Sequence, residues 1–230
     1  MNFIKLILKK MIKAIIFDFD DTLVKTFRRA YQRHTRTAKK LNLRMPSRKK
    51  FYMNFGKPWN KVIKSLWPDV SLYRYKKAYY KLNYGDIKRF HGPPPFEGLK
   101  KTLSALKKRG YRLFILSSRD KKSLKTNIDR LKIKTYIELY HGMEHSRHHK
   151  PDPRVFIPFY RKTKLKNNEI VYVGDLITDY DAAKNAGIFF VAVITGVHKK
   201  SNFLKAGLNK FFILKSVNEL PDLLKGWKNG

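Results

Sequence analysis

The residues from Ala14 to Leu23, A-I-I-F-D-F-D-D-T-L, constrain the fold more than any other stretch of the chain. The first four residues form a short apolar run without polar alternation, which is typical of a strand buried on both faces of a parallel sheet. Three carboxylates follow at once, those of Asp18, Asp20 and Asp21. Ligands of open α/β sheets bind just beyond the carboxyl ends of the strands. The stretch therefore predicts a buried strand that leads acidic side chains into a functional site.

The spacing of two of these carboxylates places them on the same side of an extended chain. Side chains alternate along a strand, so Asp18 and Asp20 share one side if the extended chain continues that far. Paired carboxylates repel each other and are costly to bury unless a cation lies between them or one of them holds a proton. Either arrangement suits catalysis, whereas the structural alternative is a polar strand end that only caps the next helix.

Length and composition limit the class of protein. The chain has 230 residues, of which 43% are hydrophobic, enough for one core domain and a small lobe. It has no cysteine, which excludes disulfides and thiol chemistry. No apolar run approaches the ~20 residues of a membrane-spanning helix. Residues 1–10 leave no room for signal-peptide cleavage before the first strand, so we expect a cytoplasmic protein in which they form an extra strand or helical turn, or reflect the choice of start site.

The charge is strongly positive, with 52 Lys and Arg against 17 Asp and Glu and a formal net charge of +35. Such a charge is compatible with nucleic-acid binding. The basic residues are nevertheless spread along the whole length, and their longest unbroken runs are Arg48–Lys50 and Lys107–Arg109. This spread favours a general compositional bias, with nucleic acid as an alternative partner. The acids are concentrated instead: six of the 17 are Asp18, Asp20, Asp21, Asp175, Asp179 and Asp181.

The order of predicted elements indicates two domains. Residues 24–92 read as helices near 24–42, 58–67 and 72–82, followed by a stiff Pro-rich linker at 91–95. From residue 98 onward helices alternate with strands; the helices are predicted at 99–108, 121–131, 153–162, 179–185 and 218–226, and the strands at 111–116, 135–140, 170–173, 188–194 and 211–213. This alternation predicts an α/β fold with a doubly wound parallel sheet. We assign residues 1–23 and 93–230 to this core domain and residues 24–92 to an α-helical insert.

Polar residues follow the predicted core strands in a recognisable order. Ser117 follows L-F-I-L, Lys150 opens K-P-D-P before a helix, and Asp175 and Asp179 form V-G-D-L-I-T-D after V-Y. Together with D-F-D-D-T, these segments resemble the four motifs of the haloacid dehalogenase (HAD) superfamily, which has a Rossmann-like core. The resemblance covers nearly the whole chain from Met11. The helical insert resembles the cap domain of phosphoglycolate-phosphatase-like members, which closes over the site and favours small substrates.

The resemblance implies a phosphatase that acts on a small phosphorylated metabolite through an aspartyl-phosphate intermediate. Asp18 is then the nucleophile, and Asp20 is the general acid for the leaving oxygen and the base for water. Ser117 and Ser118 bind the phosphoryl group. Lys150 supplies positive charge to it and offsets repulsion among the aspartates.

The resemblance also implies a Mg²⁺ cofactor. The ligands of the family correspond here to the carboxylates of Asp18 and Asp175 and to the backbone carbonyl of Asp20. Asp179 orients Asp175 or a bound water. Asp21 stands where many relatives have glycine, and we expect it to adopt the left-handed backbone that asparagine and aspartate tolerate.

Several alternatives stay open. A sugar phosphomutase uses the same groups, whereas dehalogenation is disfavoured because the carboxylate of Asp20 is a phosphatase feature. A nucleic-acid-binding protein, with or without end-phosphatase activity, is the alternative from another class. The histidines form no usual zinc pattern and indicate a polar loop; they are His141, His145, His148 and His149. Tyrosines of the insert either stack bases or, more commonly, pack between helices; they are Tyr73, Tyr75, Tyr79, Tyr80 and Tyr84.

Overall fold

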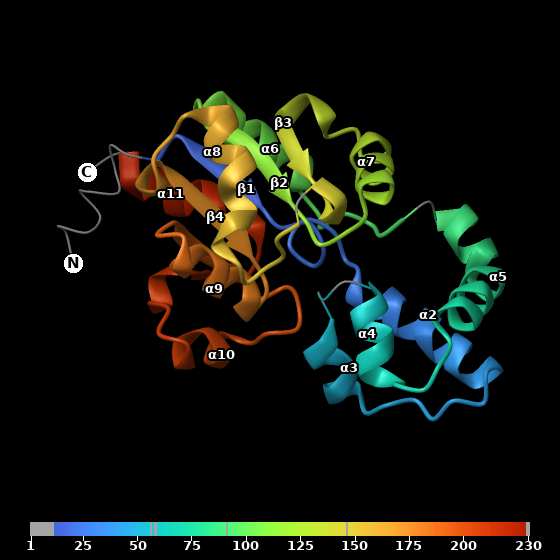
Figure 1. The fold of residues 1–230 in the computed structure, drawn as a ribbon. Coiled ribbons are helices and arrows are strands. Elements are labelled where there is room, and N and C mark those ends of the chain that lie inside the picture. The colour runs from blue at the N-terminus through green and yellow to red at the C-terminus, as the bar shows by residue number, and fades with distance from the viewer. Residues whose placement is uncertain (1–11, 56, 58, 91, 146, 229–230) are drawn as a thin grey trace. The chain divides into compact units, whose positions relative to one another are not determined.

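A computed structural model describes residues 12–55, 57, 59–90, 92–145 and 147–228, with the backbone alone for 83–90 and 226–228. The predicted element within residues 1–10 lies outside these residues. The chain divides into two compact units, a core unit of residues 1–24 and 95–230 and a helical unit of residues 25–94 (Figure 1). No helix among the described residues combines the length and the apolar character needed to cross a bilayer.

The core unit is built on one parallel sheet of six strands in the order β3-β2-β1-β4-β5-β6. The strands are β1 Ala14–Phe17, β2 Arg112–Leu116, β3 Ile137–His141, β4 Ile170–Gly174, β5 Phe189–Val193 and β6 Ile213–Leu214. β1 lies in the middle, with β2 on one side and β4 on the other. The strand order therefore reverses beside β1, as in a doubly wound Rossmann-like sheet, and the predicted fold class is confirmed.

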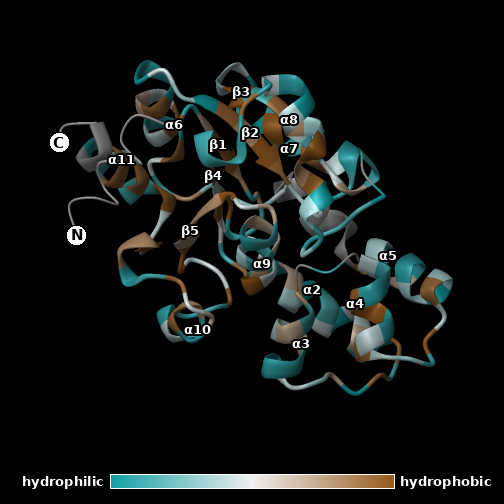
Figure 2. Cartoon of the chain, turned by 60° about the vertical axis from the view of Figure 1, so that its left-hand side comes forward, coloured by the Kyte–Doolittle hydropathy of each residue, from teal (hydrophilic) through white to brown (hydrophobic). Residues whose placement is uncertain are grey.

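Helices cover both faces of the sheet. Because strand side chains alternate, Ile15 and Phe17 belong to one hydrophobic core and Ala14 and Ile16 to the other. Residues of three helices complete the first core, α6 Leu99–Lys108, α7 Lys121–Arg130 and α11 Leu220–Lys228. The second core includes residues of α8 Ile157–Thr163, α9 Ile177–Asn185 and α10 Lys200–Lys205. Figure 2 shows the hydrophobic strands enclosed between these more polar helices.

Short 3-10 turns connect several of these elements, at Lys134–Tyr136, Met143–His145, Pro153–Phe156, Asn167–Glu169, Lys210–Phe212 and Val217–Glu219. Two of them shorten predicted strands. The last strand begins at Ile213 rather than residue 211, because the Asn209 side chain accepts a hydrogen bond from Phe211 N at 3.1 Å and closes a turn there. Likewise β3 begins at Ile137, two residues later than predicted.

The helical unit contains α2 Phe27–Lys40, α3 Arg48–Asn54, α4 Trp59–Leu66 and α5 Leu72–Phe90. Ser47 is the N-cap of helix α3, and its Oγ accepts a hydrogen bond from Lys50 N at 3.2 Å. Helix α5 runs eight residues beyond its predicted end at residue 82. Asn83 and Gly85 lower helix propensity by only about 1 kcal/mol or less each, which does not end a helix.

A buried histidine links two helices of this unit. His34 of α2 is 5% exposed, and its Nδ1 lies 2.9 Å from the hydroxyl of Tyr75 in α5. Burial, aided by the charge of Arg33, lowers the pKa of His34 from 6.5 to about 4. The ring is therefore neutral in the folded protein at neutral pH.

This pKa predicts an acid-sensitive helical unit. Between pH 6.5 and 4 the unfolded His34 binds a proton that the folded one does not, so the free energy of unfolding falls as the pH falls through this window. We expect His34 to contribute about 3 kcal/mol to that loss. The measurement is urea unfolding of a Trp227→Phe protein, followed by the fluorescence of Trp59 and Trp67.

His34→Gln should remove this part of the pH dependence. Tyr75→Phe is the matched control, because it removes the hydroxyl and leaves the buried imidazole, so the dependence should persist. An unchanged pH slope in His34→Gln would contradict the assignment.

Candidate active site

Two strand ends bring acidic side chains together. Asp18 directly follows β1, and its backbone N–H donates to Val173 O of β4 at 2.8 Å. Asp175 directly follows β4, and Asp179 lies in the first turn of α9. One carboxylate oxygen from each of the three aspartates lies within 4.8 Å of the others, and none of the residues is more than 4% exposed. The reversal of strand order beside β1 thus creates a buried acidic cluster.

Lys150 joins this cluster from the loop after β3. Its ammonium donates to Asp18 Oδ1 at 2.7 Å, to Asp179 Oδ1 at 2.6 Å and to the Tyr172 hydroxyl at 3.0 Å, and its side chain is 6% exposed. Asp179 also accepts from the Tyr172 hydroxyl at 2.8 Å and from Leu176 N at 3.1 Å. The hydrogen bonds of Asp179 therefore orient Lys150, and its role toward Asp175 or a bound water, which the resemblance implies, stays a prediction.

Burial and the charges of neighbouring groups together shift the pKa values in the cluster. Burial by itself would lower the pKa of Lys150, but the charges of Asp179 and Asp18 outweigh it and hold the pKa well above its usual value. Burial raises the pKa of Asp18 to about 7 although Lys150 opposes it. Burial, with repulsion by Asp18 and Asp179, also raises the pKa of Asp175. The cluster thus contains one ammonium and three buried carboxylates, so its positive charge does not balance its carboxylates.

The shortage of positive charge and the oxygen ligands of the cluster suit the binding of a divalent cation. Hard divalent cations prefer oxygen ligands, and Asp18 and Asp175 offer carboxylate oxygens from adjacent strand ends. A cation between them would offset the repulsion that raises both pKa values. The donor set and its charge therefore fit a divalent cation held by Asp18 and Asp175, with Asp179 occupied by Lys150 and Tyr172.

Asp20 has a different partner from Asp18. The strand ends at Phe17, and Asp20 forms an isolated parallel bridge with Val24 as the chain turns. The Asp20 carboxylate accepts two hydrogen bonds from the guanidinium of Arg119, one of them from Nε at 3.1 Å and the other from Nη2. The same guanidinium donates to Ser123 Oγ at 3.0 Å. Arg119 thereby fixes the Asp20 carboxylate at the end of β2.

The turn after β1 has the backbone that the sequence predicts for it. Asp21 has a φ of +57°, in the left-handed region. Its carbonyl accepts a hydrogen bond from Thr195 Oγ1 at 2.5 Å, and Thr22 Oγ1 donates to Asp175 Oδ1 at 3.3 Å. These bonds connect the β1 turn to the ends of β4 and β5.

Ser117 and Ser118 lie at the end of β2. The backbone N–H of Ser117 donates to His141 O at 2.9 Å, and its hydroxyl oxygen accepts from Arg119 N at 3.1 Å. A small pocket separates this strand end from the loop at 141–150, and its lining includes Ser117, Ser118, His141, His148, His149 and Lys150. The two serines and the lysine therefore face one pocket.

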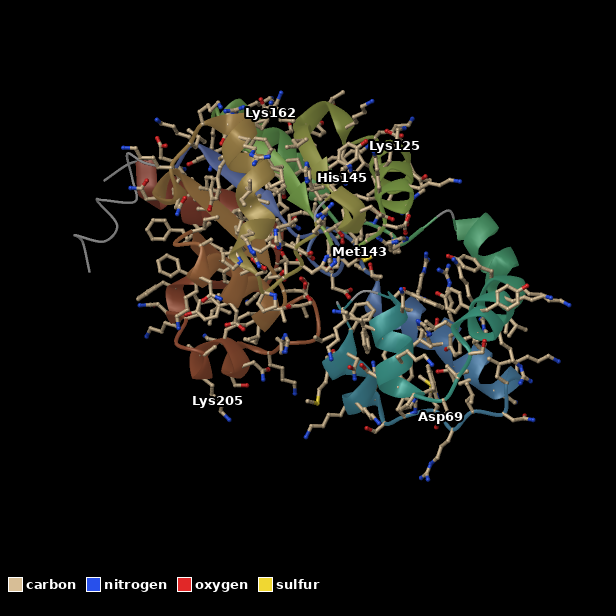
Figure 3. The ribbon with its side chains drawn as sticks, in the orientation of Figure 1. Asp69, Lys125, Met143, His145, Lys162 and Lys205 are labelled. Carbon is tan, nitrogen blue, oxygen red and sulfur yellow. The ribbon has the colours of Figure 1, made fainter. Side chains whose placement is uncertain are left out.

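The four histidines lie at the end of β3 and in the following loop, which Met143 and His145 mark in Figure 3. His145 Nδ1 accepts a hydrogen bond from Gly142 N at 2.9 Å, and burial lowers the pKa of His141 to about 4. Among the described residues, the only cluster of potential metal ligands is the one formed by the three aspartates.

Several site residues escape sequence reasoning. Tyr172 reads only as part of an apolar strand, and Arg119 only as one of many basic residues. Gly196 is the clearest case: a Cβ atom there would lie 1.8 Å from Asp175 Oδ2. A Cβ at Gly174 would lie 2.5 Å from Asp179 Oδ2. Both carboxylates occupy space that only glycine leaves free.

The close approach at Gly196 predicts a specific loss. Gly196→Ala should displace the Asp175 carboxylate and weaken the binding of divalent cations. The measurement is the rise in melting temperature caused by millimolar Mg²⁺, which reports binding to the folded state. Gly110→Ala is the control, because no atom lies within 4 Å of its added methyl group and only its φ of +83° is strained. A full Mg²⁺-dependent shift in Gly196→Ala would refute the expectation.

Comparisons with known proteins agree with this architecture. A curated protein of Clostridium perfringens, whose name, pyrophosphatase PpaX, is itself provisional, is 26% identical over 180 residues that cover 77% of this chain and 81% of the relative. The fold is shared with a predicted phosphoglycolate phosphatase of Haemophilus somnus 129PT, with a TM-score of 0.80 at 20% identity over 92% of this chain and 97% of that one. A protein of Bacteroides fragilis, provisionally named a haloacid dehalogenase-like hydrolase, has a TM-score of 0.77 at 22% identity, over 91% and 99% of the two chains. The family model for haloacid dehalogenase-like hydrolases matches residues 15–193, so the chain belongs to that hydrolase family.

Proposed function

We propose that this hydrolase is a Mg²⁺-dependent phosphatase that cleaves a small phosphomonoester through an aspartyl phosphate formed on Asp18. The observation that carries the proposal is the position of the Asp18 carboxylate, which is buried at a strand end, held by Lys150 at 2.7 Å and adjacent to Asp175. A carboxylate nucleophile divides one difficult displacement into two easier steps. Membership in the hydrolase family supports the same chemistry.

In the first step an oxygen of Asp18 attacks phosphorus, and the bond between phosphorus and the leaving oxygen breaks. Lys150 fixes one Asp18 oxygen and places a positive charge beside the phosphoryl group. The hydroxyl of Ser117 donates a hydrogen bond to a phosphoryl oxygen. Its own oxygen already accepts from Arg119 N, which restricts the directions in which the hydroxyl proton can point. Asp20 transfers a proton to the leaving alcohol.

In the second step Asp20 removes a proton from water, which attacks the phosphorus of the aspartyl phosphate. The bond between phosphorus and the Asp18 oxygen breaks, inorganic phosphate leaves and the Asp18 carboxylate is restored. Asp20 enters the first step protonated, and Arg119 pairs with the carboxylate that remains after the proton is transferred and holds it in place for the second step. Asp20 thus acts first as an acid and then as a base.

Mg²⁺ is the cofactor that the donor set favours. Asp18 and Asp175 would hold it through carboxylates and Asp20 through its backbone carbonyl. When bound, the ion offsets the negative charge of the phosphoryl group and of the buried aspartates. Lys150 and Asp179, paired at 2.6 Å, keep the remaining charge of the cluster balanced.

The names of the relatives indicate which substrates to test. Their names include a pyrophosphatase and a phosphoglycolate phosphatase. A provisional beta-phosphoglucomutase of Thermotoga maritima shares the fold with a TM-score of 0.72 at 20% identity, over 93% of this chain and 99% of that one. A phosphomutase with the same aspartates is therefore the second candidate.

The first test is phosphate release from a panel of small phosphates. Phosphoglycolate, pyrophosphate, glucose 1-phosphate and an aryl phosphate are each incubated with protein and Mg²⁺. We expect release from at least one compound, its loss on chelation of the metal, and reduction to background in Asp18→Asn, because an amide cannot form the acyl phosphate. Absence of phosphate release throughout would refute the phosphatase, whereas isomerisation of glucose 1-phosphate without release would favour the mutase.

The second test concerns the acid role of Asp20. Asp20→Asn should lower the rate by about 10²- to 10⁴-fold for an alkyl phosphate, whose leaving oxygen needs a proton. The loss should be smaller for an aryl phosphate, which leaves without full protonation. Mg²⁺-dependent melting should stay parental, since the metal contact of residue 20 is its backbone. Equal losses for both substrates, in a folded protein that still binds Mg²⁺, would remove Asp20 from the acid role.

A further inference from the structure

The positive charge is not shared evenly between the two units. The 70 residues of the helical unit contain 20 Lys and Arg but only two acids, Asp69 and Asp86, whereas the other 160 residues contain 32 and 15. The helical unit thus carries about half of the net charge in less than a third of the chain. Asp69 lies in the turn between α4 and α5 (Figure 3). Basic residues are thus present throughout both units, whereas most of the acids lie in the core unit.

Helix α5 divides its tyrosines between two faces. Tyr75 is fully buried, with its ring 5.9 Å from that of Trp59, and the ring of Tyr79 lies 5.0 Å from that of His34. These two tyrosines pack the helical unit. Tyr73 and Tyr80 are different, since they are 76% and 53% exposed.

The exposed tyrosines form a regular surface with basic neighbours. Tyr73 and Tyr80 are seven residues apart, which places them on one face of the helix about 10.5 Å apart. The exposed Lys76 and Lys77 lie between them, and the exposed Arg74 and Lys81 flank them. We call these six residues the α5 face. The ring of Tyr80 contacts that of Tyr79 edge to face at 5.7 Å, which ties it to the packed side of the helix.

We propose that the α5 face binds single-stranded nucleic acid. Lysine and arginine neutralise phosphates and release counterions, and exposed tyrosine rings offer surfaces on which unpaired bases stack. A duplex keeps its base faces inside the stack, so the tyrosines favour a single strand. The face has no aliphatic side chain to insert into lipid, which favours nucleic acid over an anionic membrane. The inference is independent of the phosphatase proposal.

The test measures fluorescence anisotropy of a labelled 20-nucleotide oligothymidine, and of a duplex of equal length, with the full chain. We expect tighter binding to the single strand at physiological salt. Tyr73→Ala/Tyr80→Ala should weaken it by about tenfold or more, and Tyr73→Phe/Tyr80→Phe should retain it, because phenylalanine still stacks. Lys76→Gln/Lys77→Gln should lower the slope of log affinity against log salt by about 1.4.

Lys200→Gln/Lys205→Gln on α10 is the matched control, since it removes the same charge from exposed positions of the core unit. It should leave the affinity close to parental; circular dichroism verifies the folding of every variant. Three results would each overturn the proposal. They are parental affinity of the double alanine variant for the oligonucleotide, a loss of affinity in the α10 control as large as that of the Lys76→Gln/Lys77→Gln variant, and absence of oligonucleotide binding at physiological salt. Binding to phosphatidylserine vesicles without binding to the oligonucleotide would overturn it in favour of a membrane surface.

Discussion

The buried ammonium of Lys150 is the interaction on which the candidate active site depends. It meets two carboxylates and a tyrosine hydroxyl in a place where its side chain is 6% exposed. Charges at such a depth are stable only when they are paired and hydrogen-bonded, and removing one partner leaves the other buried without compensation. The strand order makes this pairing possible, because β1 and β4 are neighbours and bring Asp18 within reach of the first turn of α9. The remaining negative charge is what suits the cluster to a divalent cation.

Close packing around the carboxylates is the second constraint. The loop after β5 approaches Asp175 so closely that only Gly196 fits, and the end of β4 approaches Asp179 in the same way at Gly174. Thr195, next to Gly196, holds the carbonyl of Asp21 in the left-handed turn after β1. The geometry of the acidic cluster is therefore set by three strand ends together, and the loop after β5 belongs to the site although it supplies no acidic group.

The sequence predicts the fold well where a local signal suffices. Apolar strands alternate with amphipathic helices, and the predicted helix 99–108 coincides with α6. The residues Asp18, Lys150 and Asp179, which the resemblance to the four motifs singles out, lie in direct contact. Contacts between distant residues leave no such signal: the ion pair of Asp20 with Arg119 spans 99 positions. The sequence likewise does not predict the contacts of the Tyr172 hydroxyl with Lys150 and Asp179, because a tyrosine in an apolar segment is interpreted as part of a buried strand.

The two units differ in how far acidic residues balance their basic residues. In the core unit, several acids outside the site form ion pairs with basic residues, as Glu138 does with Arg112 at 2.8 Å and Asp129 with Lys125 at 2.6 Å. The helical unit has two acids for 20 basic residues, so ion pairing cannot balance its charge in any conformation. Like charges raise the free energy of the folded unit until counterions or a polyanion condense on it. Because the acids are concentrated in the core unit, the helical unit keeps a net positive charge that attracts anions. The exposed tyrosines of α5 can also stack on nucleic-acid bases, which simple inorganic anions do not have.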